Sequence, residues 1–206
     1  MADNQARPEI FDEAGLARRR QRALRLGYAG GADFLMRETA ALIAERLADV
    51  SRRFEVAALA CAGAGIMPAA LRAAGVARIT ATDPAPSMIA GAGVEPLAWS
   101  PEALPFAPGA QDLAVSALVM HALNDPVGHL VQLRHALKPD GLMIAALFGG
   151  QTLAELRASL AEAEAEVTGT LAARVAPMGE IRDLGALLQR AGFAMPVADA
   201  ERLTVT

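Results

Sequence analysis

The stretch from Val56 to Asp83 constrains the fold of this 206-residue chain more than any other. An apolar run of strand length, Val56 to Ala60, meets a turn of small residues at 61–65, and a helix-like segment follows. A second strand-like run ends at Thr82, directly before the acid. This order is typical of a βαβ nucleotide-binding unit, in which glycines let backbone N–H groups approach the ligand and the acid accepts from ribose hydroxyls.

The rest of the chain alternates between strand-like and helix-like segments. We expect strands at 55–60, 78–82, 94–99, 112–117, 142–148 and 195–205, and helices at 31–50, 66–74, 84–90, 125–137, 152–167 and 182–191. This alternation predicts an α/β fold, a doubly wound and mainly parallel sheet with helices on both faces. Residues 1–54 are expected to form an N-terminal helical extension packed on the core, and residues 55–206 a single α/β domain.

Local signals mark some of the boundaries. Asp125 followed by a proline predicts a helix start. Thr152 and Glu155 have the spacing of a capping box. Residues 138–141, with the sequence Lys-Pro-Asp-Gly, predict a turn.

Composition excludes several classes of protein. A net charge of −4 argues against general nucleic-acid binding. No uncharged apolar run reaches the length of a membrane-spanning helix, and the first ten residues lack the apolar core of a secretory signal. The single Cys61 cannot form an intrachain disulfide, which suits a cytoplasmic protein.

Arginine is concentrated near the start of the chain, with ten in residues 1–55 and three in succession at 18–20. Apolar residues interleave with them. One interpretation is a surface helix that solvates its arginines and lays an apolar stripe on the domain. The other is a basic lid over a carboxylate-bearing ligand or an acidic partner.

Several short motifs resemble a known family. They are Ile10-Phe11-Asp12 with the arginine run, Gly63-Ala64-Gly65, the segment 102–106, Ser116-Ala117-Leu118 with His121, Asn124-Asp125, the segment 137–141, Phe148-Gly149-Gly150 with Thr152 and 155–157, and 183–185 with 190–193. Together they resemble the class I S-adenosylmethionine-dependent methyltransferases. Within these, the chain is similar to the branch of the mitochondrial complex I assembly-factor methyltransferase-like proteins and their alphaproteobacterial relatives.

The resemblance implies S-adenosylmethionine as the cofactor. It assigns cofactor-binding positions to Cys61, Gly63, Ala64, Gly65, Asp83, Pro84, Ser100, Glu102, Ser116 and His121. Asp83 matches the acid that accepts from the ribose hydroxyls, and the alternative is a simple cap for the next helix. His121 is either a packing residue or a base, so no catalytic residue is assigned. His129, His135 and Asp112 are expected to be structural, and no metal site is expected.

Three positions depart from the family pattern. Leu59 replaces an acid, Cys61 a glycine in a turn that favours positive φ, and Ser100 an aspartate that takes the adenine amino group. Each lost polar contact costs about 1 to 3 kcal/mol, so two or three losses weaken binding more than about a hundredfold. The family's seventh strand is missing, and a homodimer or a partner protein is expected to cover the open sheet edge.

Three functions therefore remain open from the sequence. The first is methyl transfer from S-adenosylmethionine to an unknown acceptor, with a partly degraded cofactor site. The second is protein modification, because the mitochondrial member of the branch is described as an arginine hydroxylase. The third is a non-catalytic assembly or partner-binding protein of the respiratory complex that kept the fold.

Overall fold

The computed structural model describes residues 9–27, 31–100, 103–172 and 174–205. Within them, five parallel strands form one sheet in the order β3-β2-β1-β4-β5. The strands are β1 (Val56–Ala60), β2 (Arg78–Thr82), β3 (Glu95–Leu97), β4 (Gln111–Ala117) and β5 (Leu137–Ala146). The helices are α1 (Glu13–Arg25), α2 (Phe34–Ala48), α3 (Ile66–Ala73), α4 (Pro126–Ala136), α5 (Ala154–Thr168) and α6 (Ile181–Arg190), with 3-10 turns η2 (Pro86–Met88) and η3 (Met120–Ala122). The expected α/β fold with a parallel sheet is confirmed.

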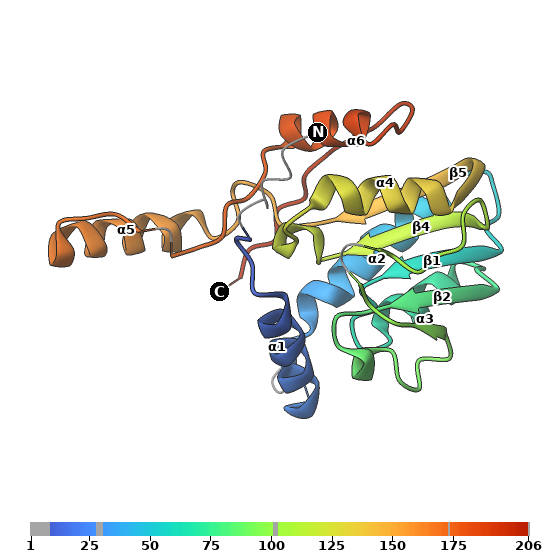
Figure 1. The fold of residues 1–206 in the computed structure, drawn as a ribbon, viewed down its shortest axis with the longest axis horizontal. Helices are drawn as coiled ribbons and strands as arrows, with labels where there is room; N and C mark the ends of the chain where they lie inside the picture. Colours follow the sequence, from blue (N-terminus) through green and yellow to red (C-terminus); the bar gives the residue numbers. More distant parts are fainter. Residues whose placement is uncertain (1–8, 28–30, 101–102, 173, 206) are drawn as a thin grey trace, which may run out of the picture.

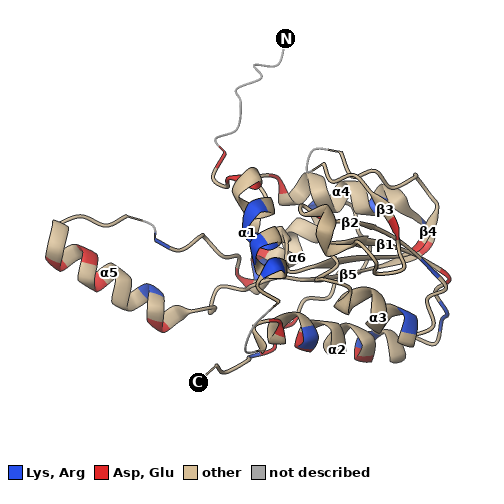
Figure 2. Cartoon of the chain, turned by 90° about the horizontal axis from the view of Figure 1, so that it is seen from below, with Lys and Arg blue, Asp and Glu red and all other residues tan. Residues whose placement is uncertain are grey.

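Helices cover both faces of the sheet (Figure 1, Figure 2). On one face, Ile43 of α2 and Leu71 of α3 belong to the same buried cluster as Leu59 of β1. On the other face, Leu133 of α4 packs with Ala58. Every residue of β1 is buried because alternate side chains enter opposite layers, which explains its continuous apolar sequence.

Strand register sets which loops meet at the carboxyl edge of the sheet. Ala60 pairs with Thr82 on one side and with Ser116 on the other. The residues that follow β1, β2 and β4 therefore emerge side by side. This is the edge at which open parallel sheets bind ligands.

The amino edge is held by Asp112, which accepts from the backbone N–H groups of Glu55 (3.2 Å) and Val56 (3.1 Å) and from Lys138 Nζ (2.7 Å). Its expected structural role is confirmed. The predicted turn at 138–141 lies within β5 as an irregularity in the register with β4, and Asp140 has a φ of +63°.

The predicted strand at 195–205 is wrong, since this segment has no regular structure. A strand needs a neighbour for its N–H and C=O groups, and the segment runs beside α2 instead. There Asp199 and Glu201 lie 2.5 and 3.6 Å from Arg46 Nη2. Met195 is 91% exposed, so its apolar side chain buries nothing. Within the described residues, β5 is therefore an edge strand.

Helix α5 projects from the body of the molecule as an arm (Figure 1), and none of its residues is buried. The predicted capping box is wrong: the helix starts after Leu153, which has a left-handed φ of +51°, and no side chain caps it. By contrast, Asp125 caps α4 as predicted, accepting from Gly128 N at 2.9 Å. The predicted helix at 84–90 is reduced to η2. In the described part of the chain no helix is long and apolar enough to cross a bilayer.

Candidate functional site

The loop after β1 has an unusual backbone. Cys61, Gly63, Ala64 and Gly65 have φ values of +76°, +56°, +53° and +85°. Two of these four residues are not glycine, and a left-handed conformation costs such a residue about 1 to 2 kcal/mol. The expected positive φ at Cys61 is thus confirmed. Strain of this kind persists where surrounding structure imposes it, and it gathers at functional sites.

Two neighbours impose the shape of this loop. Cys61 N donates to Thr82 O at 2.9 Å, which continues the pairing of β1 with β2. A Cβ at Gly63 would lie 2.7 Å from Met36 Sδ on α2, so a larger residue there would require the Met36 side chain to move. Burial raises the pKa of the Cys61 thiol, which favours its neutral form. We therefore assign Cys61 no role as a nucleophile.

Asp83 lies at the centre of the edge, and its side chain is 0% exposed. Its Oδ2 accepts from Ala62 N at 3.1 Å, which joins the acid to the loop after β1. Its Oδ1 accepts from Ala85 N at 2.9 Å, a local turn bond two residues on. The alternative that Asp83 simply caps the next helix is wrong, because the cap residue of η2 is Ala85 and no side chain caps that turn. The ribose role stays a prediction.

The remaining partner of Asp83 comes from α1. Arg20 Nε donates to Oδ1 at 3.0 Å and Arg20 Nη2 to Oδ2 at 2.8 Å, a bidentate ion pair. The sequence showed the arginine run but gave no sign of which arginine faces the sheet. Three other arginines of α1 are exposed to solvent, namely Arg18, Arg19 and Arg22. Helix α1 therefore combines both interpretations of the arginine run. It solvates most of its arginines and covers a carboxylate, but that carboxylate is Asp83 of the same chain. Figure 2 shows the basic residues along α1.

The position of α1 is set by its first residues. Asn124, after η3, accepts from Ile10 N and Phe11 N, both at 2.9 Å. Asp12 then caps the helix by accepting from Gly15 N at 2.7 Å. Two motifs that the sequence analysis noted separately, the N-terminal one and Asn124, are thus parts of one anchor.

The residues after β4 form the other side of the edge. Ser116 Oγ lies 3.0 Å from His129 Nε2 of α4, and both side chains are buried. Burial lowers the pKa of His129 to about 4, so this histidine is neutral and structural, as expected. His121 packs its ring 4.5 Å from that of Phe148. Burial and the nearby charge of Arg20 lower the pKa of His121 to about 4.

The other predicted positions are less connected to this centre. Pro84 is buried and, with Ala85 and Ser87, lines a cavity of about 290 Å³ against Arg18 and Gln21 of α1. The Ser100 hydroxyl accepts from Ala103 N at 3.3 Å, within its own loop. Glu102 lies outside the described residues.

Two further observations bear on what the edge can hold. Leu59, where the family pattern has an acid, is buried in the core beneath the sheet and offers no polar group. Among the described residues, no three His, Cys, Asp or Glu side chains gather in a way that could hold a metal ion.

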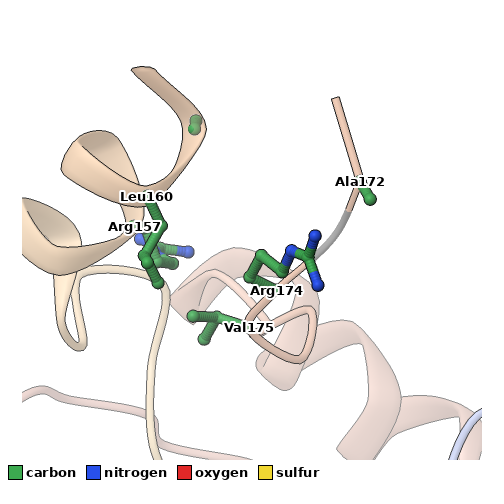
Figure 3. Close-up of a pocket in the computed structure, with 6 residues that line it drawn as sticks. Arg157, Leu160, Ala172, Arg174 and Val175 are labelled. Carbon is green, nitrogen blue, oxygen red and sulfur yellow. The ribbon is translucent and has the colours of Figure 1, made fainter. Parts of the chain in front are cut away.

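A second cavity, of about 190 Å³, lies on the arm rather than at the sheet (Figure 3). Arg157, Leu160 and Ala161 of α5 line it on one side, and Ala172, Arg174 and Val175 on the other. An ion pair between Arg174 and Glu164 ties the two sides together. This cavity brings together none of the predicted site residues.

Comparison with known proteins agrees with the fold. Residues 58–145 match a family model described as a methyltransferase domain. The crystal structure of a SAM-dependent methyltransferase from Thermotoga maritima superposes with a TM-score of 0.60, at 19% identity, over 84% of this chain and 80% of that one. The chain is thus similar to methyltransferases, in sequence over residues 58–145 and in fold over most of its length.

Two curated relatives have names that give different activities. "Arginine-hydroxylase NDUFAF5, mitochondrial" of Danio rerio is 35% identical over 201 residues, which is 95% of this chain and 63% of that protein. A malonyl-[acyl-carrier protein] O-methyltransferase of Laribacter hongkongensis is 40% identical over 105 residues, 51% of this chain and 33% of that protein. This methyltransferase-like chain therefore spans under two thirds of the length of either relative. The resemblance to the assembly-factor branch is confirmed.

Proposed function

We propose that this chain binds S-adenosylmethionine at the carboxyl edge of its sheet and transfers the methyl group to an acceptor. The observation that supports the proposal is the bond between Ala62 N and Asp83 (3.1 Å), which joins the strained loop to the acid that we assign to the ribose. When bound, the cofactor supplies an activated methyl group. Such transfer depends mainly on proximity and orientation, so it requires no fixed base from the protein.

The residues fit an adenosyl ligand on the condition that Arg20 moves away from Asp83. As the site stands, both oxygens of Asp83 accept from Arg20 and from backbone N–H groups. A guanidinium fork presents two parallel donors to a carboxylate, and two neighbouring ribose hydroxyls would do the same. Ribose would therefore take the place of Arg20, while Ala62 and Ala85 keep their bonds to Asp83. The loop at 61–65 would hold the methionine part, and Pro84 and Ser100 would lie towards the adenine.

His121 would face the acceptor side of this site. Its ring is neutral near pH 7 because of burial and of the charge on Arg20. A neutral imidazole could accept a proton from the acceptor, although no acceptor is identified. Its packing on Phe148 would orient the ring.

Calorimetric titration with S-adenosylmethionine and S-adenosylhomocysteine tests the proposal. We expect the wild-type chain to bind both ligands, and Asp83→Ala to weaken binding by about a hundredfold or more, because two charge-assisted hydrogen bonds are lost. Asp140→Ala is the matched control, since Asp140 is an exposed aspartate near the start of β5, at the amino edge of the sheet. Absence of binding at millimolar ligand would overturn the proposal.

The alternative is a protein that acts on, or assembles with, a protein partner. It is favoured by the name of the Danio rerio relative and by the complete pairing of Asp83. On that proposal the fold serves either protein modification, as in an arginine hydroxylase, or respiratory-complex assembly without catalysis. A homodimer or partner on the open edge of β5 and a cytoplasmic location stay predictions. Failure to bind either adenosyl ligand would favour this alternative.

A further inference from the structure

Arg20 occupies the two carboxylate positions that a ribose would need. Its Nε and Nη2 atoms lie 3.0 and 2.8 Å from the two oxygens of Asp83. The Asp83 side chain is 0% exposed and that of Arg20 is 15% exposed, so α1 seals this pair from solvent. A ligand cannot reach the carboxylate unless the guanidinium leaves.

Helix α1 is attached in a way that permits this movement. Gly15 is the one fully buried residue of α1, and Leu16 packs, partly buried, against a core cluster that includes Val119, so the helix makes few buried apolar contacts. Its attachments include the Asn124 anchor before its first turn and the Arg20 ion pair about two turns into the helix. Elements with few buried apolar contacts open at low free energy. The anchor at one end lets the rest of the helix lift while it remains tethered.

We propose that Arg20 is an internal competitor for the ribose subsite, so that α1 closes the site in the free chain and opens when an adenosyl ligand binds. This inference rests on the proposed function. Any ligand with two adjacent hydroxyls at this position has to displace the arginine. The apparent affinity is then the intrinsic affinity reduced by the fraction of molecules in which α1 is open.

The inference predicts that removing Arg20 increases the affinity for the ligand. Removing a residue from a ligand site normally weakens binding. Removing a competitor strengthens it, and the gain equals the inverse of the open fraction. If α1 is open in about one molecule in ten or fewer, Arg20→Gln should lower the dissociation constant for S-adenosylhomocysteine by about tenfold or more.

Affinity is measured by calorimetry for the wild type, Arg20→Gln, Arg20→Lys and the control Arg19→Gln. Arg19 is exposed on the same helix, so its variant should bind as the wild type does. Arg20→Lys keeps the positive charge beside Asp83, so it should fold even where Arg20→Gln does not. It loses the two parallel donors of the guanidinium, so its gain in ligand affinity should be intermediate. Weaker or unchanged binding in both Arg20 variants would overturn this inference alone. Absence of binding in all four proteins would instead overturn the proposed function.

A second measurement reports the opening of α1 directly. Trypsin cleaves after arginine, so limited proteolysis of the full chain, read by mass spectrometry at Arg18, Arg19, Arg22 and Arg25, reports how often α1 opens. We expect cleavage in α1 to rise several-fold in Arg20→Lys relative to the wild type, and in the wild type on adding S-adenosylhomocysteine. Equal cleavage in the ligand-free wild type and Arg20→Lys would show that the ion pair does not hold α1 and would overturn the inference.

Discussion

The side-chain amide of Asn124 bonds to the backbone of Phe11 in both directions, although the residues are 113 positions apart. Asn124 Oδ1 accepts from Phe11 N at 2.9 Å and Nδ2 donates to Phe11 O at 3.1 Å. The amide thus acts as a short piece of backbone. Because this contact fixes where α1 begins, it also determines that Arg20 reaches Asp83.

Replacing Asn124 should therefore loosen α1. We expect Asn124→Ala to lower the free energy of unfolding by about 2 kcal/mol, since it removes four hydrogen bonds that are exposed or partly exposed. Urea denaturation measures this loss, and tryptic cleavage within α1 should increase. Asn124→Asp keeps the acceptor and loses the donor, so its loss should be smaller. Equal stability of Asn124→Ala and the wild type would show that the anchor carries no stability.

A side chain at Gly63 should clash with Met36 of α2 and lower the stability of the fold. Gly63→Ala would place a Cβ 2.7 Å from Met36 Sδ at a φ of +56°, and we expect a loss of roughly 2 to 4 kcal/mol from overpacking and left-handed strain. In a Met36→Ala background the same change should cost only about 1 kcal/mol, the strain alone. Urea denaturation of the wild type, the two single variants and the double variant completes this double-mutant cycle. Equal cost in both backgrounds would exclude the clash as the cause.

Asp112 should stabilise the fold in a pH-dependent way. The ammonium of Lys138 holds the pKa of Asp112 below its ordinary value of 3.8, and the backbone N–H groups of Val56 and Glu55 act in the same direction. A lowered carboxyl pKa gives stability that is present above about pH 4 and is lost as the pH falls through the folded value. Asp112→Asn should be less stable at pH 7 and lose less between pH 5 and 2. Asp140→Asn, which changes an exposed carboxylate, is the control variant.

His129 should make the protein sensitive to mild acid. Burial lowers its pKa to about 4 from 6.5, so between these values the unfolded chain binds a proton that the native chain excludes. Stability is then complete above about pH 6.5 and falls as the pH drops towards 4. We expect His129 to account for about 2 kcal/mol of the loss between pH 7.5 and 5.

Urea denaturation at the two pH values checks this loss. His129→Gln should show a smaller acid loss than the wild type, and the remainder should include His121, whose pKa is lowered in the same way. His135→Gln alters an exposed histidine on the same helix and is the control. An undiminished loss in His129→Gln would assign the pH dependence to other groups.

Local sequence signals predicted correctly the elements that depend on interactions between residues close in the sequence. The proline after Asp125 and the continuous apolar run of β1 each predicted an element that the structure contains. They failed where the outcome depended on a distant neighbour. The segment from Met195 has residues suited to a strand, but within the part of the chain that the structure describes no strand pairs with it.

The sequence by itself determined the βαβ unit, its loop and its acid, because apolar runs, glycines and turn residues act over a few positions. Only the tertiary structure decided what the acid contacts. Arg18, Arg19 and Arg20 are chemically equivalent along the chain, and the docking of α1 through Asn124 selects one of them for Asp83. That choice rests on the burial of one ion pair between segments 63 residues apart, which no local pattern encodes.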